Sequence, residues 1–148
     1  MGKNYRECVV AVVKNDLGQY LVGQRAGKPG SWQFPQGGVD EGESPREALL
    51  RELEEEVGCG NVDILKECPE WISYDFPSSL HSAIAQRFKG QTQKWFLVSF
   101  KEGYGPDLSL ADGEFDGIDW RSVSEIVSGI VEWKKQAYVD GIAALELE

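Results

Sequence analysis

The sequence has few of the residues that form disulfides in a small domain or bind soft metal ions. Its 148 residues include three cysteines, one histidine and one methionine. Three cysteines cannot all pair within one chain, and Cys8, Cys59 and Cys68 lack the spacing of a zinc site. A chain of this length can bury a core without disulfides or structural metal. We therefore expect reduced cysteines and one folded domain over residues 1–148.

Long apolar runs are also missing. No segment approaches the roughly 20 apolar residues of a membrane-spanning helix. The first residues, MGKNYREC, contain no apolar stretch long enough for a signal peptide. These absences argue against a membrane association and predict a cytoplasmic location. Nothing in the sequence indicates a stable protein partner.

Positive charge is scarce. The chain has 15 lysines and arginines against 25 acidic residues, and a formal net charge of −10. Proteins that bind nucleic-acid backbones draw much of their affinity from basic side chains, so this balance disfavours general attraction to such backbones. A small anionic substrate could still bind where a metal ion or a local basic cluster reverses the field.

What the sequence does have is a dense acidic segment around one expected helix. Ser44 suits the N-cap position with Glu47 as its capping-box partner, and Pro45 suits the first turn. Gly58 suits the position just after a helix. We therefore expect a helix at Pro45–Val57.

The helical period sorts the side chains of this helix into faces at about 100° per residue. The expected apolar stripe consists of Leu49, Leu50, Leu53 and Val57. Glu52, Glu55 and Glu56 share an adjoining stripe, because separations of three and four residues bring side chains together. Glu54 points to the opposite side. Three carboxylates without soft ligands favour Mg²⁺, with Mn²⁺ able to substitute.

The spacing of the segment follows a fixed pattern, G-x5-E-x7-R-E-U-x-E-E-x-G-U, where U is a bulky aliphatic residue. It starts at Gly37. A solvated acidic helix, the alternative, would not require glycines at both ends, a lone Glu43 upstream or Arg51 directly before Glu52. The pattern resembles the Nudix box. Resemblance to the Nudix hydrolases implies an α/β fold, an α/β/α sandwich with a mixed sheet, in which the box forms a loop-helix-loop.

The same resemblance implies roles for the residues of the box. The metal ligands would be Glu52, Glu55 and Glu56, with the backbone carbonyl of Gly37 as a further oxygen. Glu43 and Arg51 would pair and tie the helix to its loop; an ordinary surface salt bridge is the alternative. The implied cofactor is Mg²⁺.

Three strings outside the box narrow the resemblance to one branch. Residues 31–38, 90–97 and 114–117 resemble the asymmetrical diadenosine tetraphosphate hydrolases of plant and bacterial type and the bacterial RNA 5′-pyrophosphohydrolases. The resemblance runs from about Tyr5 to Tyr138.

Membership of that branch would give roles to residues far from the box. Glu114 would add a metal ligand or act as the base. Tyr74 and Trp133 would stack on a nucleotide base, although each could instead belong to the core. The expected phosphate contacts are Arg6, Arg25, Lys94 and Lys134, with Lys28 a weaker candidate. Lys94 leads this group because it lies inside a matched string.

Two substrates fit this branch. The first is diadenosine tetraphosphate, hydrolysed to ATP and AMP; the second is 5′-triphosphorylated RNA, from which pyrophosphate is removed. The acidic composition and the string at residues 69–77 favour the first. A nucleotide-binding module without catalysis would show a broken ligand set, and an acidic scaffold would leave the fixed spacing unexplained.

Apolar patterning and turn residues predict the remaining elements. Strands are expected at residues 8–13, 20–25, 32–34, 62–76, 91–101 and 115–121. A loop at residues 77–90 would contain a helical turn near 80–85. A C-terminal helical region would begin near Val123, break near Gly129 and resume over residues 130–145.

Overall fold

A mixed five-stranded sheet forms the centre of the molecule. The computed structural model describes residues 3–148. The neighbouring strands of the larger sheet are β4 (Gln36–Gly38), β1 (Asn4–Val13), β7 (Phe88–Phe100) and β5 (Val62–Glu67), and β6 (Ile72–Asp75) also pairs with β7. β1 and β7 run parallel, and the other pairs are antiparallel. The turn after β1 leads into a smaller antiparallel sheet of β3 (Trp32–Gln33), β2 (Tyr20–Arg25) and β8 (Phe115–Arg121).

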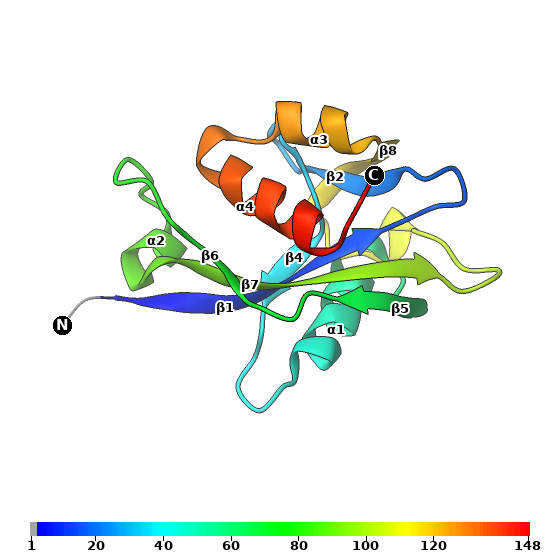
Figure 1. Cartoon of the computed structure of the whole chain (residues 1–148), viewed down its shortest axis with the longest axis horizontal. Helices are drawn as coiled ribbons and strands as arrows, with labels where there is room; N and C mark the ends of the chain where they lie inside the picture. Colours follow the sequence, from blue (N-terminus) through cyan, green and yellow to red (C-terminus); the bar gives the residue numbers. More distant parts are fainter. Residues whose placement is uncertain (1–2) are drawn as a thin grey trace.

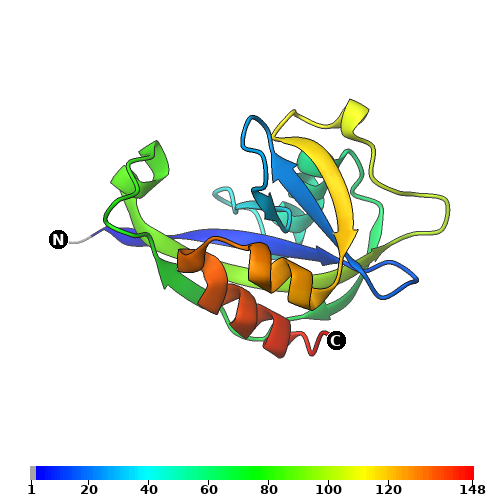
Figure 2. The same ribbon diagram turned by 90° about the horizontal axis from the view of Figure 1, so that it is seen from above.

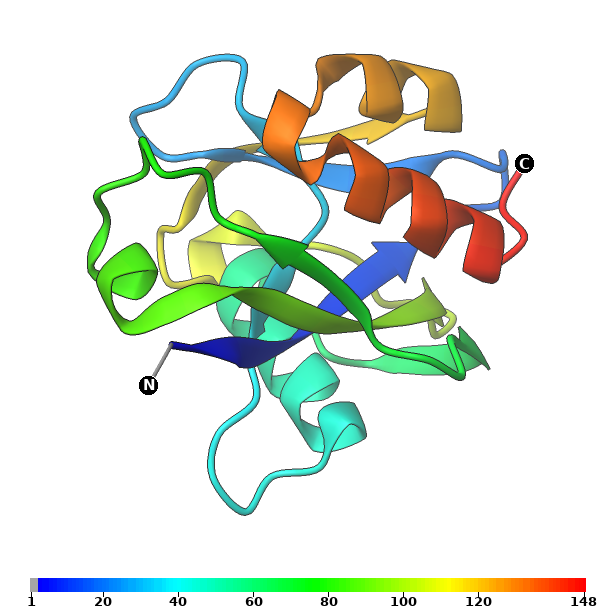
Figure 3. The same cartoon turned by 60° about the vertical axis from the view of Figure 1, so that its left-hand side comes forward.

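Helices cover both faces of the larger sheet. α1 (Pro45–Val57) lies against one face, and α3 (Val123–Gly129) with α4 (Glu132–Ala144) lies against the other (Figures 1 and 3). Seen from above, α4 runs along the sheet (Figure 2); it packs against β6, and its Tyr138 meets Trp95 of β7 edge-on. The short helices α2 (Ala83–Arg87) and η1 (Leu108–Leu110) lie in connections. The expected α/β/α sandwich with a mixed sheet is confirmed.

The apolar part of β1 is buried on both faces. Side chains alternate along a strand, and Val9, Ala11 and Val13 pack in the cluster that contains the apolar face of α1. Val10 and Val12 pack in the cluster on the α4 side. A strand covered on both faces has a nearly continuous apolar sequence. The polar start of β1 carries no such signal, so the strand begins at Asn4, earlier than expected.

α1 has the expected bounds, because its caps are local. Ser44 accepts a hydrogen bond from Glu47 N, Glu47 returns one to the Ser44 backbone, and Gly58 adopts the left-handed conformation. One member of the expected apolar stripe was placed wrongly, since Leu50 is 39% exposed. The buried face is instead centred on Leu49 and Leu53. The helical period gives the angles between side chains but not which of them meets the sheet.

The single strand expected at residues 62–76 is wrong; the segment forms two strands. β5 and β6 pair one after the other with the same side of β7. Pro69 lies between them and has no N–H for a ladder hydrogen bond. The Cys68 N–H still donates to the carbonyl oxygen of Trp95. Both segments have strand-like sequences, so their apolar pattern hid the break.

Other differences are small. β7 starts at Phe88, α2 lies slightly later than the expected turn, and β4 was not expected as a strand. β4 contains two glycines, which have low strand preference, and it forms only because β1 offers a free edge. Of the helices within residues 3–148, none combines the length and the hydropathy that a bilayer crossing requires.

Candidate active site

The second half of α1 divides its glutamates between the protein and solvent. Glu56 is 4% exposed and the side chain of Glu52 is 13% exposed, whereas that of Glu55 is 46% exposed. Glu54 is exposed, as its position on the opposite side of the helix predicts. Glu52 and Glu56 therefore form the buried part of the candidate site.

Glu56 is a buried carboxylate close to other negative charges. Its Oε2 accepts a hydrogen bond from Gln36 N at 3.1 Å. Burial, followed by the charges of Glu52, Glu114 and Asp112, raises the pKa of Glu56 to about 9, while the Gln36 hydrogen bond acts in the opposite direction. No ion pair to Glu56 is found among residues 3–148. A cation bound here would relieve this repulsion.

Gly37 of β4 lies directly against the Glu52 carboxylate. A Cβ atom added at Gly37 would overlap the carboxyl group of Glu52. Burial raises the pKa of Glu52, and Arg51 opposes this shift. The pattern therefore needs glycine at position 37 because the carboxylate occupies the space of a side chain.

Arg51 connects the loop and the helix. Its Nε donates to Glu43 Oε2 at 2.8 Å and its Nη2 donates to Glu43 Oε1 at 2.9 Å. Nη2 also donates to the carbonyl oxygen of Gly38, and Nη1 donates to Glu52 Oε1 at 2.8 Å. The Arg51 hydrogen bonds hold the pKa of Glu43 at about 2. The two residues that the sequence paired are in bidentate contact.

The loop before β8 brings Glu114 towards the end of α1. The Asp112 N–H donates to the carbonyl oxygen of Glu55 at 2.7 Å. The charge of Glu114 contributes to the raised pKa of Glu56. Glu114 is thus close enough to interact with Glu56 although 58 positions separate them in the sequence.

Among residues 3–148, no three acidic, histidine or cysteine side chains converge on a single point that could hold a metal ion as they stand. Arg51 Nη1 contacts both Glu52 and Glu55, which keeps these carboxylates paired with a guanidinium. The donor chemistry nevertheless fits a hard cation, since all candidate ligands are oxygens and Glu56 is buried near like charges. Within residues 3–148, the buried Gln36 Oε1 has no hydrogen-bond donor.

Four basic residues form a second half of the site, which we call the basic cluster. They are Arg6 on β1, Arg25 at the end of β2, Lys28 in the following loop and Lys134 on α4. Burial, followed by the positive charges of Arg25 and Lys28, lowers the pKa of Lys134 to about 8. Lys134 Nζ donates to Gln33 Oε1 at 3.2 Å.

The acidic and basic halves meet at Cys8 on β1. Burial raises the pKa of the Cys8 thiol to about 11, and the charges of Arg6, Glu52 and Lys134 all act on it. The Arg6 guanidinium also lies against Gly38, where a Cβ atom would be 2.6 Å from Nη2. The charge balance here therefore differs from that of the whole chain.

An aromatic cluster of Tyr74, Phe76 and Trp133 lies on the α4 side. The ring centroids of Tyr74 and Trp133 are 5.7 Å apart with an interplanar angle of 50°, and Phe76 meets Trp133 edge-on at 5.9 Å. Tyr74 Oη donates to Gln91 Oε1 at 2.8 Å, and burial raises the pKa of the phenol. Tyr74 and Trp133 touch, so a base would stack on an outer face or separate them. The sequence analysis did not select Phe76, although it follows Tyr74 by two positions in the same strand-like string.

Lys94 is not brought to this site. Its Nζ donates to the carbonyl oxygen of Pro69 at 3.2 Å and lies 3.5 Å from Glu67 Oε2. Side chains alternate along β7, and Phe96 packs on the α1 side while Trp95 packs on the α4 side. Lys94 therefore shares the α1 face and reaches towards the β5 edge, away from β4. A matched string placed it near the phosphates, but the string does not specify which way the side chain turns.

Comparison with known proteins gives one family. A model of the NUDIX domain matches residues 4–140. Over 148 aligned residues, the chain is 41% identical to the RNA pyrophosphohydrolase of Campylobacter jejuni subsp. jejuni serotype O:23/36, strain 81-176. That alignment covers 97% of this chain and 94% of the relative.

Solved structures agree with the fold. The E. coli dihydroneopterin triphosphate pyrophosphohydrolase superposes with a TM-score of 0.73 at 22% identity, covering 95% of this chain and 99% of the other. A C. elegans Ap4A hydrolase superposes with a TM-score of 0.66 at 18% identity, covering 94% and 96%. At these identities the likeness concerns the fold alone.

Proposed function

Because the chain belongs to the NUDIX domain family and is a hydrolase of pyrophosphate bonds, we propose that it removes pyrophosphate from the 5′-triphosphate end of RNA. Water is consumed, one phosphoanhydride bond is broken, and a 5′-monophosphate RNA and pyrophosphate are the products. The observation that carries this choice is the 41% identity to an RNA pyrophosphohydrolase over nearly the whole chain. It favours the substrate that the sequence analysis placed second.

The acidic composition of the whole chain does not argue against RNA binding at the site itself. The net charge of −10 is a property of the whole chain, whereas an RNA end meets only the local field. We propose that the basic cluster of Arg6, Arg25, Lys28 and Lys134 binds the triphosphate. The charge of Arg6 acts on Glu52, and this proximity supports the role, because the triphosphate must contact both halves.

The carboxylates would hold a divalent cation. The proposed ligands are Glu52, Glu55, Glu56, Glu114 and the carbonyl oxygen of Gly37. Mg²⁺ suits this oxygen set best, with Mn²⁺ as a substitute. A bound cation supplies neutralisation of phosphate charge and a lower pKa of bound water. Arg51 would orient Glu52 and Glu55 through the contacts described above, and one carboxylate not engaged as a ligand would accept the proton of the attacking water.

The aromatic cluster would receive a base of the RNA. Stacking is tolerant of base identity, because every base has a flat π-face. Trp133 is partly buried and lies at the start of α4, where Lys134 follows it. A base on Trp133 would therefore place its phosphates near the basic cluster.

Diadenosine tetraphosphate remains the second candidate. The string at residues 69–77 favoured it, and this string contains both Tyr74 and Phe76 of the aromatic cluster. A dinucleotide would use the same cation, basic cluster and rings. The two substrates differ in one respect: only RNA has further nucleotides after the 5′ end that could contribute to binding.

The deciding experiment compares the two substrates side by side. The purified protein is incubated with Mg²⁺ and either 5′-triphosphorylated RNA or diadenosine tetraphosphate, and the products are identified. We expect pyrophosphate and 5′-monophosphate RNA, a higher kcat/KM for RNA, and loss of activity with EDTA. A higher kcat/KM for the dinucleotide would contradict the proposal. Reaction in ¹⁸O-labelled water locates the attacked phosphorus.

We also propose that the enzyme works in the cytoplasm. Cys8, Cys59 and Cys68 are free and buried, which suits a reducing compartment. RNA with a 5′-triphosphate is the direct product of transcription initiation, so the substrate would arise in the same compartment in bacteria. Fractionation of cells that express a tagged protein tests this location.

A further inference from the structure

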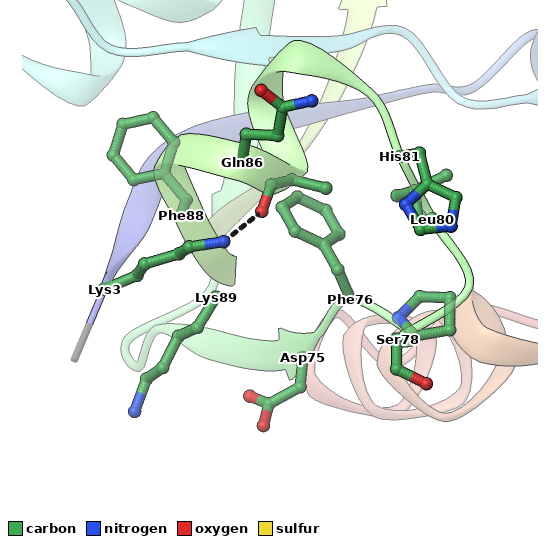
Figure 4. Close-up of a pocket in the computed structure, with 11 residues that line it drawn as sticks. Lys3, Asp75, Phe76, Ser78, Leu80, His81, Gln86, Phe88 and Lys89 are labelled. Atoms are coloured by element: carbon green, nitrogen blue, oxygen red, sulfur yellow. Dashed lines mark hydrogen bonds between the residues drawn. The ribbon is translucent and has the colours of Figure 1, made fainter.

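A pocket of about 570 Å³ lies beside the aromatic cluster and, apart from Phe76, is lined by residues that have no role in the site described above (Figure 4). It is formed by the end of β6, the connection into α2, the start of β7 and the beginning of the described chain. Its polar and aromatic lining includes Lys3, Asp75, Phe76, His81, Gln86 and Lys89. This volume falls within the roughly 300–1,000 Å³ typical of small-ligand sites.

The pocket and the candidate active site share Phe76. This ring packs against Trp133 and Tyr74, and it also lines the pocket, where Figure 4 shows it pointing into the space. If one base of the RNA stacks on the Trp133 ring, the RNA strand would therefore enter the pocket directly beyond Phe76.

The lining suits a single-stranded nucleic acid. Two lysines, Lys3 and Lys89, face one carboxylate, Asp75, so the pocket is locally positive in an acidic chain. Lys3 Nζ donates to the carbonyl oxygen of Ala85 at 2.8 Å, and Lys89 Nζ lies 4.5 Å above the Tyr5 ring. Both ammonium groups are exposed and free of carboxylate partners among residues 3–148.

Flat rings and hydrogen-bonding groups complete the lining. Phe76, Phe88 and His81 provide surfaces on which a base can stack, and His81 is the single histidine of the chain. The exposed amide of Gln86 can donate and accept hydrogen bonds. Proteins that bind single strands combine such rings with cations that follow the backbone.

We propose that this pocket binds the nucleotides of the RNA that lie downstream of the reacting 5′ end. The inference rests on the proposed function and makes it more specific: the enzyme recognises a single-stranded RNA segment and not only a terminal nucleotide. The occupant is chosen by charge and position, since a strand running from Trp133 past Phe76 carries phosphates towards Lys3 and Lys89. Diadenosine tetraphosphate would end before these lysines.

The test is the dependence of KM on RNA length. Triphosphorylated dinucleotide and octanucleotide RNAs of the same 5′ sequence are compared for the wild type, Lys89→Ala, His81→Ala and the control Lys101→Ala. Lys101 is also an exposed lysine and directly follows the end of β7, whereas the pocket lies at the start of β7. Its Nζ lies 4.0 Å from Asp63 Oδ1. We expect a lower wild-type KM for the octanucleotide, and a roughly three- to tenfold rise of that KM in Lys89→Ala. Lys89→Arg should restore it.

Binding of the 5′-monophosphorylated octanucleotide, measured by calorimetry, is the readout that does not need turnover. Lys89→Ala should weaken it, and Lys101→Ala should not. Equal KM values for both RNA lengths, or an unchanged octanucleotide affinity in Lys89→Ala and His81→Ala, would overturn the pocket while leaving RNA hydrolysis intact. If Lys89→Ala raised the KM for diadenosine tetraphosphate as much as the KM for the octanucleotide, the pocket proposal would also be overturned. Absence of turnover on every triphosphorylated RNA would instead contradict the proposed function.

Discussion

The chemistry of the candidate site depends first on individual carboxylates that differ in their surroundings. Glu56 is buried and near Glu52 and Glu114, and its pKa is raised to about 9, whereas Glu54 on the same helix is exposed. Four neighbouring glutamates of one sequence cluster are therefore not equivalent. Their roles can be separated by single substitutions.

Glu56→Gln removes the ionisable carboxyl group but keeps an oxygen that can accept the hydrogen bond from Gln36 N. We expect kcat to fall by about two to four orders of magnitude, since a metal ligand or proton acceptor is lost. The melting temperature at neutral pH should stay close to that of the wild type, because a pKa of about 9 keeps Glu56 largely protonated without a bound cation. Glu54→Gln is the control and should keep kcat close to wild type. A comparable loss in Glu54→Gln would refute the assignment of faces.

Gly37→Ala tests the contact between β4 and the Glu52 carboxylate. The new methyl group would overlap that carboxyl group, so Glu52 must move. We expect a loss of activity of at least about tenfold and a destabilisation of roughly 1–3 kcal/mol, typical of overpacking. Gly105→Ala is the matched control, since nothing lies near its added Cβ atom. Urea unfolding and steady-state kinetics measure both effects, and full activity in Gly37→Ala would contradict the close approach.

At the scale of elements, the box functions only if its loop and its helix keep a fixed relation. Arg51 links them through Glu43 and the Gly38 carbonyl. The other side of the site depends on α4, which carries Trp133 and Lys134 to the large sheet. The two elements come from opposite faces of the sandwich, and each can be tested separately.

The Glu43–Arg51 link predicts a pH dependence of stability. The pKa of Glu43 is about 2 in the folded protein against an ordinary value of 4.5. The ionised form is thus favoured by folding, so the link stabilises the protein fully above about pH 4.5 and is lost as the pH falls towards 2. The melting temperatures of wild type and Glu43→Gln should differ at pH 7, and this difference should disappear between pH 4.5 and about 2. A difference that is independent of pH would refute the assignment.

Trp133→Ala tests whether α4 presents a stacking surface. Trp133 contacts Tyr74 and Phe76 but is only partly buried. We expect KM to rise by roughly five- to a hundredfold, in line with about 1–3 kcal/mol per stacked base, and the melting temperature to fall by a few degrees at most. Val139→Ala, an exposed apolar position on the same helix, is the control. An unfolded Trp133→Ala protein with unchanged KM in its folded fraction would identify Trp133 as a core residue.

For the whole molecule, the distribution of charge matters more than its sum. The chain carries −10 overall, yet six of its 15 basic residues lie in the two sites where we propose that an RNA end binds. They are Arg6, Arg25, Lys28 and Lys134 in the basic cluster and Lys3 and Lys89 in the pocket. The remaining acidic surface would repel a longer RNA strand, so the binding site is short.

This arrangement predicts a limited salt dependence. Each phosphate contact with a single strand contributes about −0.7 to the slope of log affinity against log salt. Six cations therefore allow a slope no steeper than about −4 for a triphosphorylated octanucleotide at fixed Mg²⁺. The slope is measured from kcat/KM between low and physiological salt. A much steeper slope would reveal a longer basic track than the described residues contain.

The sequence was informative wherever the signal is local. The bounds of α1 were predicted correctly because Ser44, Glu47 and Gly58 act within one or two turns. The family followed from the spacing of the box, and the fold class followed from the resemblance to that family. Predictions failed where the outcome depends on distant partners: Leu50 is exposed, and the segment 62–76 is divided between β5 and β6 because both pair with β7.

The sequence by itself determined the family, the helix and the oxygen-only chemistry of its glutamates, because spacings of three and four residues fix neighbours on a helix. Only the tertiary structure decided which groups surround them. It buried Glu56 near Glu114, placed Lys134 beside Gln33, and turned Lys94 towards Pro69. The reason is physical: strand pairing and helix packing join residues far apart in the chain, and no local pattern specifies the direction of a long side chain.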